Sequence, residues 1–422
     1  MNNLKKYAFA DLYDMASGIS STKDQAGHGA PFVSFSTVFN NYLLPDELPD
    51  LMDTSEKEQE IYSIKEGDIL ITRTSETIDE LAMSCVATKD YPKATYSGFT
   101  KRLRPKTEGI AYSKYLAFYL RGYLFRKAVT NNAFMTLRAS FNEDIFSFLN
   151  LHLPDYEQQV KIGDLFYLIE QTIQLNKKIN DNLLQQLQLI YNYWFTQFDF
   201  PSKENHPYNA SGGVMVRNEQ VKRTIPANWE LKSLGELCIF RNGINYDKSI
   251  EGEKTYKIIN VRNISSTDIM LNENELDEIR LPQKQGDKYC VSAESIIIAR
   301  SGIPGATRIL YKPSNNTIFC GFVISCTPID SDMQYYLTFY LKQLEGSSAT
   351  KTGGSILQNV SQDTLSNLIV PIPPKEILGK FNQIVSQTFE LFHENLKETS
   401  RLVKLRDWLL PLLMNGQATI DD

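Results

Sequence analysis

Two arginine–hydroxyl pairs each follow a short β-branched stretch that reads as a buried strand. The pairs are Arg73-Thr74, after Ile69–Ile71, and Arg300-Ser301, after Ile296–Ile298. An arginine can neutralise a phosphate or bond a guanine edge through two donors, and a hydroxyl can donate to phosphate oxygen. An ion pair with a nearby acid such as Glu76 is the structural alternative. Because both pairs persist while their surroundings differ, we predict a binding role.

A basic segment adds further candidates. Positions 93 to 138 hold ten basic residues and one acid, Glu108, in a chain with a net charge of −6. Aromatic and small polar residues at positions 96–100 are interleaved with the cations, a pattern that favours contact with nucleic acid. For Arg121, Arg126 and Lys127, a solvated helix face is an equally good interpretation. The candidates outside that helix are Lys101, Arg102, Arg104 and Lys106, and the second half of the chain adds Arg308 and Lys351.

These residues belong to a sequence that is written twice. Five segments recur in the same order at a nearly constant offset, for example Asp144–Pro154 as Asp363–Pro373, and chance similarity would not keep that order. Clustered short strands with one or two short helices predict that each half is an α+β globule. The expected strands are Phe32–Phe35, Ile69–Ile71, Met83–Ala87 and Thr317–Ser325, and the expected helices are Lys114–Ala128 and Met333–Leu344.

Each globule precedes a long amphipathic helix, predicted over Glu157–Phe195 and Lys375–Met414. Seam positions recur in steps of three and four, averaging about the 3.5 residues of a coiled coil. The first seam is Ile162, Phe166, Ile169, Ile173, Asn176, Ile179, Leu183, Leu187, Ile190 and Trp194. The second is Phe381, Ile384, Thr388, Leu391, Asn395, Glu398, Leu402, Leu405, Leu409 and Leu412.

Either helix alone could be an ordinary core helix, but the repeat favours an antiparallel pair with a pseudo-twofold axis. Asn176 and Asn395 are separated by the same offset as the segments that precede the two helices, so they occupy equivalent positions. We therefore predict that they face each other where the helices cross, as a polar pair that fixes the register.

The predicted order is a globule (1–155), a helix (156–200), a second globule (201–372) and a second helix (373–416). Asp199–Thr224 reads as a solvated linker, since it is rich in Pro, Gly and small polar residues. The chain has no apolar run of about 20 residues and no apolar leader segment, so we expect a cytoplasmic location.

Sequence motifs argue against several kinds of site. Five scattered cysteines without a CxxC pair, and four separated histidines, indicate neither a disulfide framework nor a metal site. The chain lacks GxGxxG and GxxxxGK[ST], so no phosphate-binding loop is indicated. We expect no catalytic residue, no metal and no cofactor in this chain.

The chain resembles the specificity subunit of type I restriction-modification systems. The resemblance spans the whole chain, in the family's own order of globule, helix, globule and helix. The family's glycine after the arginine–hydroxyl strand is present as Gly302, whereas Ser75-Glu76 stands there in the first half. The segments that carry the resemblance are Gly67–Thr74, Leu151–Asp155, Tyr193–Pro201, Val370–Pro374 and Leu409–Gln417.

The resemblance implies a non-catalytic DNA-binding protein with two target recognition domains. Each domain would read one half of an asymmetric bipartite site in double-stranded DNA. The helices would space the domains and dock two methyltransferase subunits, which bring S-adenosylmethionine and methylate adenine. Restriction and translocase subunits would add ATP- and Mg-dependent cleavage.

Two other functions remain open from the residues themselves. The chain could be a duplicated coiled-coil scaffold that joins proteins without binding DNA, which its acidic charge favours slightly. It could also be an enzyme with a site assembled between the globules. Sequence-specific, salt-dependent DNA binding with the methyltransferase partner discriminates the first interpretation from both.

Overall fold

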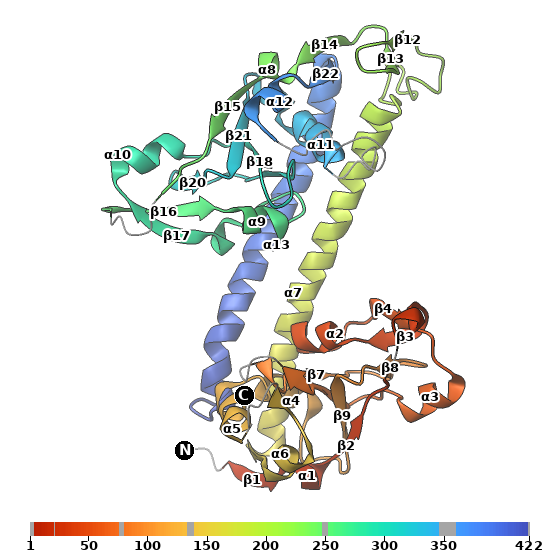
Figure 1. The fold of residues 1–422 in the computed structure, drawn as a ribbon, viewed down its shortest axis with the longest axis vertical. Helices are drawn as coiled ribbons and strands as arrows, with labels where there is room; N and C mark the ends of the chain where they lie inside the picture. Colours follow the sequence, from red (N-terminus) through yellow and green to blue (C-terminus); the bar gives the residue numbers. More distant parts are fainter. Residues whose placement is uncertain are drawn as a thin grey trace. The chain divides into compact units, whose positions relative to one another are not determined.

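The computed structural model describes residues 4–20, 22–75, 80–132, 139–246, 252–345 and 360–420. The chain forms two compact units (Figure 1), one of Met1–Gln174 with Arg401–Asp422 and the other of Leu175–Ser400. Both units include part of each long helix, because α7 spans Tyr156–Tyr191 and α13 spans Lys375–Met414. None of the described helices combines the length and hydrophobicity needed to cross a bilayer.

The first unit has two main sheets. One is antiparallel with the order β2-β9-β5-β7, and the other has the order β4-β3-β8, in which β3 and β8 are parallel. Two short antiparallel pairs, β1-β11 and β6-β10, complete the unit. Its strands are β1 (Lys5–Ala8), β2 (Tyr13–Ser17), β3 (Ala26–Val33), β4 (Asp50–Met52), β5 (Ile69–Thr72), β6 (Thr74–Ser75), β7 (Ser84–Val86), β8 (Thr95–Tyr96), β9 (Thr100–Pro105), β10 (Ala139–Ser140) and β11 (Asn150–Leu153). Its short helices are α1 (Phe9–Leu12), α2 (Phe35–Asn40), α3 (Glu56–Ile61), α4 (Ser113–Tyr119), α5 (Tyr123–Asn132) and α6 (Glu143–Phe148).

The second unit repeats both sheets with the orders β15-β21-β18-β19 and β17-β16-β20, and β14-β22 repeats β1-β11. It also carries the hairpin β12-β13, which follows a π-helical turn at Asn192–Thr196. The strands are β12 (Met215–Asn218), β13 (Arg223–Pro226), β14 (Glu230–Ser233), β15 (Cys238–Asn242), β16 (Lys254–Ile259), β17 (Asp277–Leu281), β18 (Ile296–Ala299), β19 (Thr307–Ile309), β20 (Thr317–Phe319), β21 (Val323–Pro328) and β22 (Ile369–Ile372). The helices are α8 (Leu234–Leu237), α9 (Val261–Ser265), α10 (Gln283–Gly286), α11 (Gln334–Leu344) and α12 (Gln362–Ser366).

The predicted duplication is confirmed down to single β-bridges. The parallel bridge between Ile19 and Ser97 in the first unit recurs between Ile244 and Cys320 in the second. The two main sheets have the same strand order in both units, with β16 and β20 parallel like β3 and β8. The α+β class is therefore confirmed for both halves.

Four predicted segments differ in detail. The strand predicted over Phe32–Phe35 ends at Val33, because Ser34 caps α2, which begins at Phe35. Thr317–Ser325 is two strands in different sheets, β20 and β21, because a turn at Cys320–Val323 separates them. The helix predicted over Lys114–Ala128 is broken into α4 and α5 next to Gly122. The predicted linker is folded onto the second unit, where Phe200 stacks on Trp229 with ring centroids 5.7 Å apart.

Within each unit, α7 and α13 run antiparallel. In the second unit Asn176 donates to Glu398 at 2.8 Å, and Asn395 donates to Asn180 at 2.9 Å. The partner's number along α13 therefore falls as the number along α7 rises. Each predicted asparagine bonds a residue three or four positions from the other, so the hydrogen-bonded register lies one turn from the predicted one.

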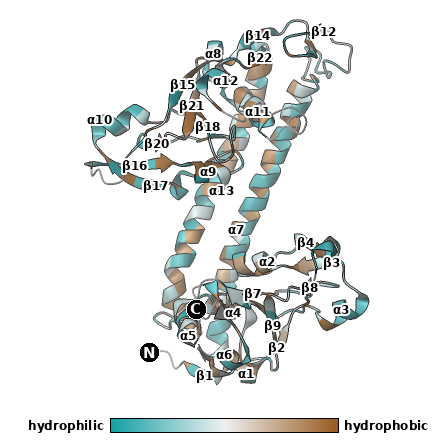
Figure 2. Cartoon of the chain, in the orientation of Figure 1, coloured by the Kyte–Doolittle hydropathy of each residue, from teal (hydrophilic) through white to brown (hydrophobic). Residues whose placement is uncertain are grey.

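The buried seam also departs from the predicted one. Phe381 of α13 is buried as predicted, but from there to Phe392 the buried positions are Val385, Phe389 and Phe392, each one residue beyond the predicted Ile384, Thr388 and Leu391. After the midpoint of α7, the predicted Leu187 and Trp194 are buried, but Asn180, Leu184 and Tyr191 are buried in place of the predicted Ile179, Leu183 and Ile190. Figure 2 shows hydrophobic and hydrophilic residues alternating along both helices. A straight α-helix has 3.6 residues per turn, so its buried stripe drifts away from a strict 3.5-residue repeat.

Neighbouring residues of α13 test this seam. Phe389 is fully buried, whereas Leu391 is 49% exposed. We expect Phe389→Ala to lower the free energy of unfolding by about 3–5 kcal/mol, and Leu391→Ala to change it by less than about 0.5 kcal/mol. Urea titration followed by circular dichroism measures both variants. A larger loss of unfolding free energy for Leu391→Ala than for Phe389→Ala would support the seam predicted from the sequence.

Candidate nucleic-acid interface

Each predicted arginine–hydroxyl pair follows an interior strand of a four-stranded sheet, β5 or β18, and lies against a tight turn. The backbone N–H of Arg73 donates to the carbonyl of Phe99 at 2.8 Å. The same bond joins Arg300 to Phe322 at 2.9 Å. Both arginine side chains are exposed, while Thr74 and Ser301 are half-buried. The structure therefore places the two arginines equivalently.

Each turn presents an exposed phenylalanine. The N–H of Thr100 donates to the carbonyl of Ser97 at 2.9 Å, so Gly98 and Phe99 occupy the tip. Phe99 is 61% exposed and its equivalent, Phe322, is 63% exposed. Full burial of a phenylalanine side chain stabilises a fold by about 1.5–3 kcal/mol. Because Phe99 and Phe322 are mostly exposed, they do not contribute much of this free energy to folding. We name these groups the first Arg–Phe turn (Arg73, Gly98, Phe99) and the second Arg–Phe turn (Arg300, Gly321, Phe322).

A close backbone contact holds each turn in place. Gly98 donates to the carbonyl of Ile19 at 2.7 Å, and Ile19 donates to the carbonyl of Tyr96 at 2.9 Å. Both bonds recur in the second unit. A Cβ atom on Gly18 would lie 2.2 Å from the Ser97 carbonyl oxygen, and one on Gly243 would lie 2.1 Å from that of Cys320. Only glycine fits such an approach, so the turn backbone is fixed while its side chains face outward.

The strand cations nearest the first Arg–Phe turn are engaged within the fold. The Lys101 side chain is 6% exposed, and its ammonium donates to Ser17 at 2.9 Å and to Glu143 at 3.1 Å. Arg102 is 9% exposed, bonds the Ser63 carbonyl and lies over Tyr96. These interactions give Lys101 and Arg102 structural roles, in contrast to the prediction from charge alone.

Arg104 forms a two-pronged ion pair with the fully buried Asp68, at 2.8 and 2.6 Å. Hydrogen bonding to that carboxylate raises the pKa of the guanidinium. At the equivalent place in the second unit, the hydroxyls of Ser295 and Thr327 are 3.1 Å apart. Both contacts join the turn before a central strand to the neighbouring strand, so Arg104 is structural as well.

Arg308 is the most deeply buried of the candidates within the described residues. It is 4% exposed and bonds the carboxylate of Glu345 at 2.9 and 3.0 Å. Its guanidinium also donates to the carbonyls of Ile264 and Thr267, near the end of α9. In the first unit Arg121 donates to the equivalent carbonyls at the end of α2. The guanidinium that binds these carbonyls comes from strand β19 in the second unit. In the first unit it comes from Arg121, between α4 and α5.

Two candidates remain less defined. Lys106 is 38% exposed and bonds Asp14 at 3.2 Å and the Ala10 carbonyl at 2.9 Å. Lys351 lies outside the described residues, as does Glu76, the acid considered for Arg73. Sequence reasoning did not name Phe99 or Phe322 as site residues, although the Gly98-Phe99 dipeptide recurs as Gly321-Phe322.

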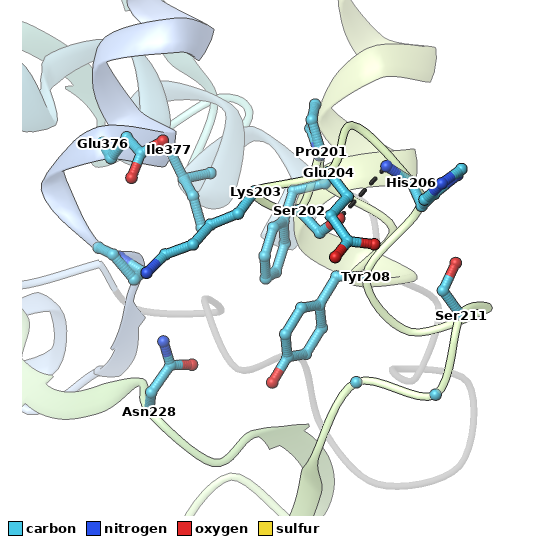
Figure 3. Close-up of a pocket in the computed structure, with 14 residues that line it drawn as sticks. Pro201, Ser202, Lys203, Glu204, His206, Tyr208, Ser211, Asn228, Glu376 and Ile377 are labelled. Atoms are coloured by element: carbon cyan, nitrogen blue, oxygen red, sulfur yellow. Dashed lines mark hydrogen bonds between the residues drawn. The ribbon is translucent and has the colours of Figure 1, made fainter.

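A surface pocket of about 500 Å³ lies in the second unit, and its walls include the loop before the β12-β13 hairpin. Figure 3 shows Lys203 on this loop extending toward the start of α13, where Glu376 and Ile377 lie, while the Tyr208 ring points toward Asn228. A function performed by both units does not require this pocket. Within the described residues, no cluster of His, Cys, Asp and Glu could hold a metal ion.

Arg308 and Arg300 should separate structural from surface arginines within one unit. We expect Arg308→Ala to lower the free energy of unfolding by about 3–5 kcal/mol, because Glu345 loses its buried partner. Arg300→Ala should change stability by less than about 0.5 kcal/mol, since its side chain is exposed. Urea unfolding measures both, and equal losses would contradict this assignment.

A family model described as the type I restriction modification DNA specificity domain matches residues 3–185 and 226–402, once in each repeat. The type I restriction enzyme MjaIX specificity subunit of Methanocaldococcus jannaschii is 23% identical, covering 88% of this chain and 82% of that protein. The HindI specificity subunit of Haemophilus influenzae is also 23% identical, covering 99% of this chain and 100% of that protein.

A solved structure shows the same fold. The S subunit of a type I restriction-modification system from M. genitalium matches with a TM-score of 0.58 at 14% identity, covering 100% of this chain and 97% of that one. The two family matches cover well over half of the sequence and fall on the two repeats. The chain belongs to the type I restriction-modification DNA specificity family.

Proposed function

We propose that this chain is the sequence-specific DNA-binding subunit of a type I restriction-modification complex, and that each unit reads one half of an asymmetric bipartite site. The observation that carries the proposal is that one exposed Arg–Phe turn recurs on the same sheet in both units, beside strands β9 and β21 that differ in sequence. Two equivalent but non-identical surfaces suit two different half-sites. The chain would work in the cytoplasm and contribute no catalytic residue.

Partner subunits would supply the chemistry. Methyltransferase subunits would bring S-adenosylmethionine to methylate adenine, and restriction subunits would use ATP and Mg. Equivalent positions of the long helices carry exposed apolar side chains, Leu189 on α7 and Trp408 on α13, which are 67% and 64% exposed. Large exposed apolar side chains at repeated positions favour two equivalent protein-docking surfaces. Docking of two methyltransferase subunits accounts for them.

DNA binding is tested with the chain reconstituted together with its methyltransferase subunits. We expect methylated adenines in cells that express this complex to define one bipartite asymmetric sequence. A duplex with that sequence should bind more tightly than one with either half altered, by about 1–3 kcal/mol for each changed base pair. Sequencing of methylated sites and a binding titration at several salt concentrations measure this. Binding without sequence preference at every salt concentration favours the scaffold function instead.

Partner docking is tested by charge substitution on the helices. We expect Leu189→Glu and Trp408→Glu each to remove one methyltransferase subunit, because each puts a charge into an apolar contact. Native mass spectrometry should then show one copy in place of two. Gln185→Glu, one turn from Leu189 on the same exposed face, adds the same charge without removing an apolar group and should keep both copies. Full assembly by all three variants would exclude these positions from the docking surfaces.

A further inference from the structure

The two units can be compared position by position to separate residues with a common role from residues that differ. If the units read different half-sites, side chains that read bases should differ between them. Side chains that act on any DNA should be kept. This comparison rests on the proposed function, and it uses the match of strand β9 to β21, which have the same place in the two four-stranded sheets.

The β9 positions have diverged almost completely. Lys101, Arg102 and Arg104 correspond to Ile324, Ser325 and Thr327. The Arg–Phe turn beside them is unchanged in residue type, in backbone hydrogen bonds and in the exposure of its phenylalanine. Packing explains why the glycines and Ile19 are kept. The glycines lie in close backbone contacts, and the side chain of Ile19 is buried. Packing does not explain why exposed Arg73 and Phe99 recur as Arg300 and Phe322.

We propose that the two Arg–Phe turns are sequence-independent DNA anchors, which dock each unit on the duplex while other residues read the bases. The arginine binds a phosphate, and the phenylalanine ring makes an apolar contact that does not depend on base identity. Phosphate contacts position a protein on DNA without reading sequence. Apolar contact with the deoxyribose is also independent of sequence, because every nucleotide carries the same sugar.

The geometry suits an anchor. The backbone of each turn is tied to the neighbouring sheet through Ile19 or Ile244, so little conformational freedom is lost when the side chains bind. Three groups lower the pKa of the Glu143 carboxyl. The largest effect comes from the backbone N–H of Glu143, the next from Lys101, and a smaller one from the nearby Arg73. A phosphate would supply a stronger and more localised negative partner for this exposed guanidinium.

The test measures affinity for the target duplex and for duplexes with single base-pair changes, using the full chain with its methyltransferase subunits. We expect Arg73→Ala to weaken binding to all duplexes by the same factor and to reduce the salt slope by about 1. Arg73→Lys should restore most of the loss, because a phosphate needs charge and a guanine edge needs the fork of arginine. Phe99→Ala should weaken binding to all duplexes about tenfold, because the buried apolar area of the ring is lost. Arg300 and Phe322 should behave alike.

Phe148→Ala is the matched control. Phe148 is 71% exposed in the same unit, and the equivalent position in the second unit is Asn367. We expect it to leave affinity unchanged. Phe99→Ala binding as tightly as this control, or any anchor variant changing which base is preferred, overturns the proposal while the DNA-binding function stands. If the unmodified complex shows no sequence preference, the proposed function fails and the anchors with it.

Discussion

The close approach between Gly18 and the carbonyls of Tyr96 and Ser97 is the constraint on which each globule depends. This contact joins the end of β2 to the turn between β8 and β9, and so connects the two sheets of the unit. Gly243 repeats it in the second unit. Because a Cβ atom cannot fit there, the positions of the turn and of the arginine bonded to it follow from one backbone contact.

Around that fixed contact, the repeats keep interactions while changing residues. The Asp68–Arg104 ion pair of the first unit is a Ser–Thr hydroxyl contact in the second. The carbonyls at the ends of α2 and α9 receive a guanidinium from Arg121 in one unit and from Arg308 in the other. Buried carbonyls and carboxylates must be satisfied in any sequence, but more than one side chain can do so. Structural cations can therefore differ between units that share one fold.

These substitutions explain what could be predicted from the sequence. Strand β5 and its repeat, both long helices and the Arg73 and Arg300 pair were predictable, because alternation, apolar spacing and repetition are visible in the residues themselves. The roles of Lys101, Arg102 and Arg308 were not, since their charge is local but their partners are distant in the sequence. The break in Thr317–Ser325 could not be predicted, because Gly321-Phe322 is a short interruption and the residues on both sides are typical of strands.

The long helices have a polar middle between two apolar ends. Ile162 to Ile173 of α7 pack in the core of the first unit, and Leu184 to Trp194 pack in the core of the second. Between them the contacts are polar, through Asn176, Asn180 and their partners on α13. Each unit consequently has a hydrophobic core of its own. A substitution in one core need not be compensated in the other, so one globule can change its binding surface while the other keeps its packing. Separate cores therefore permit the surfaces of the two units to diverge within one chain.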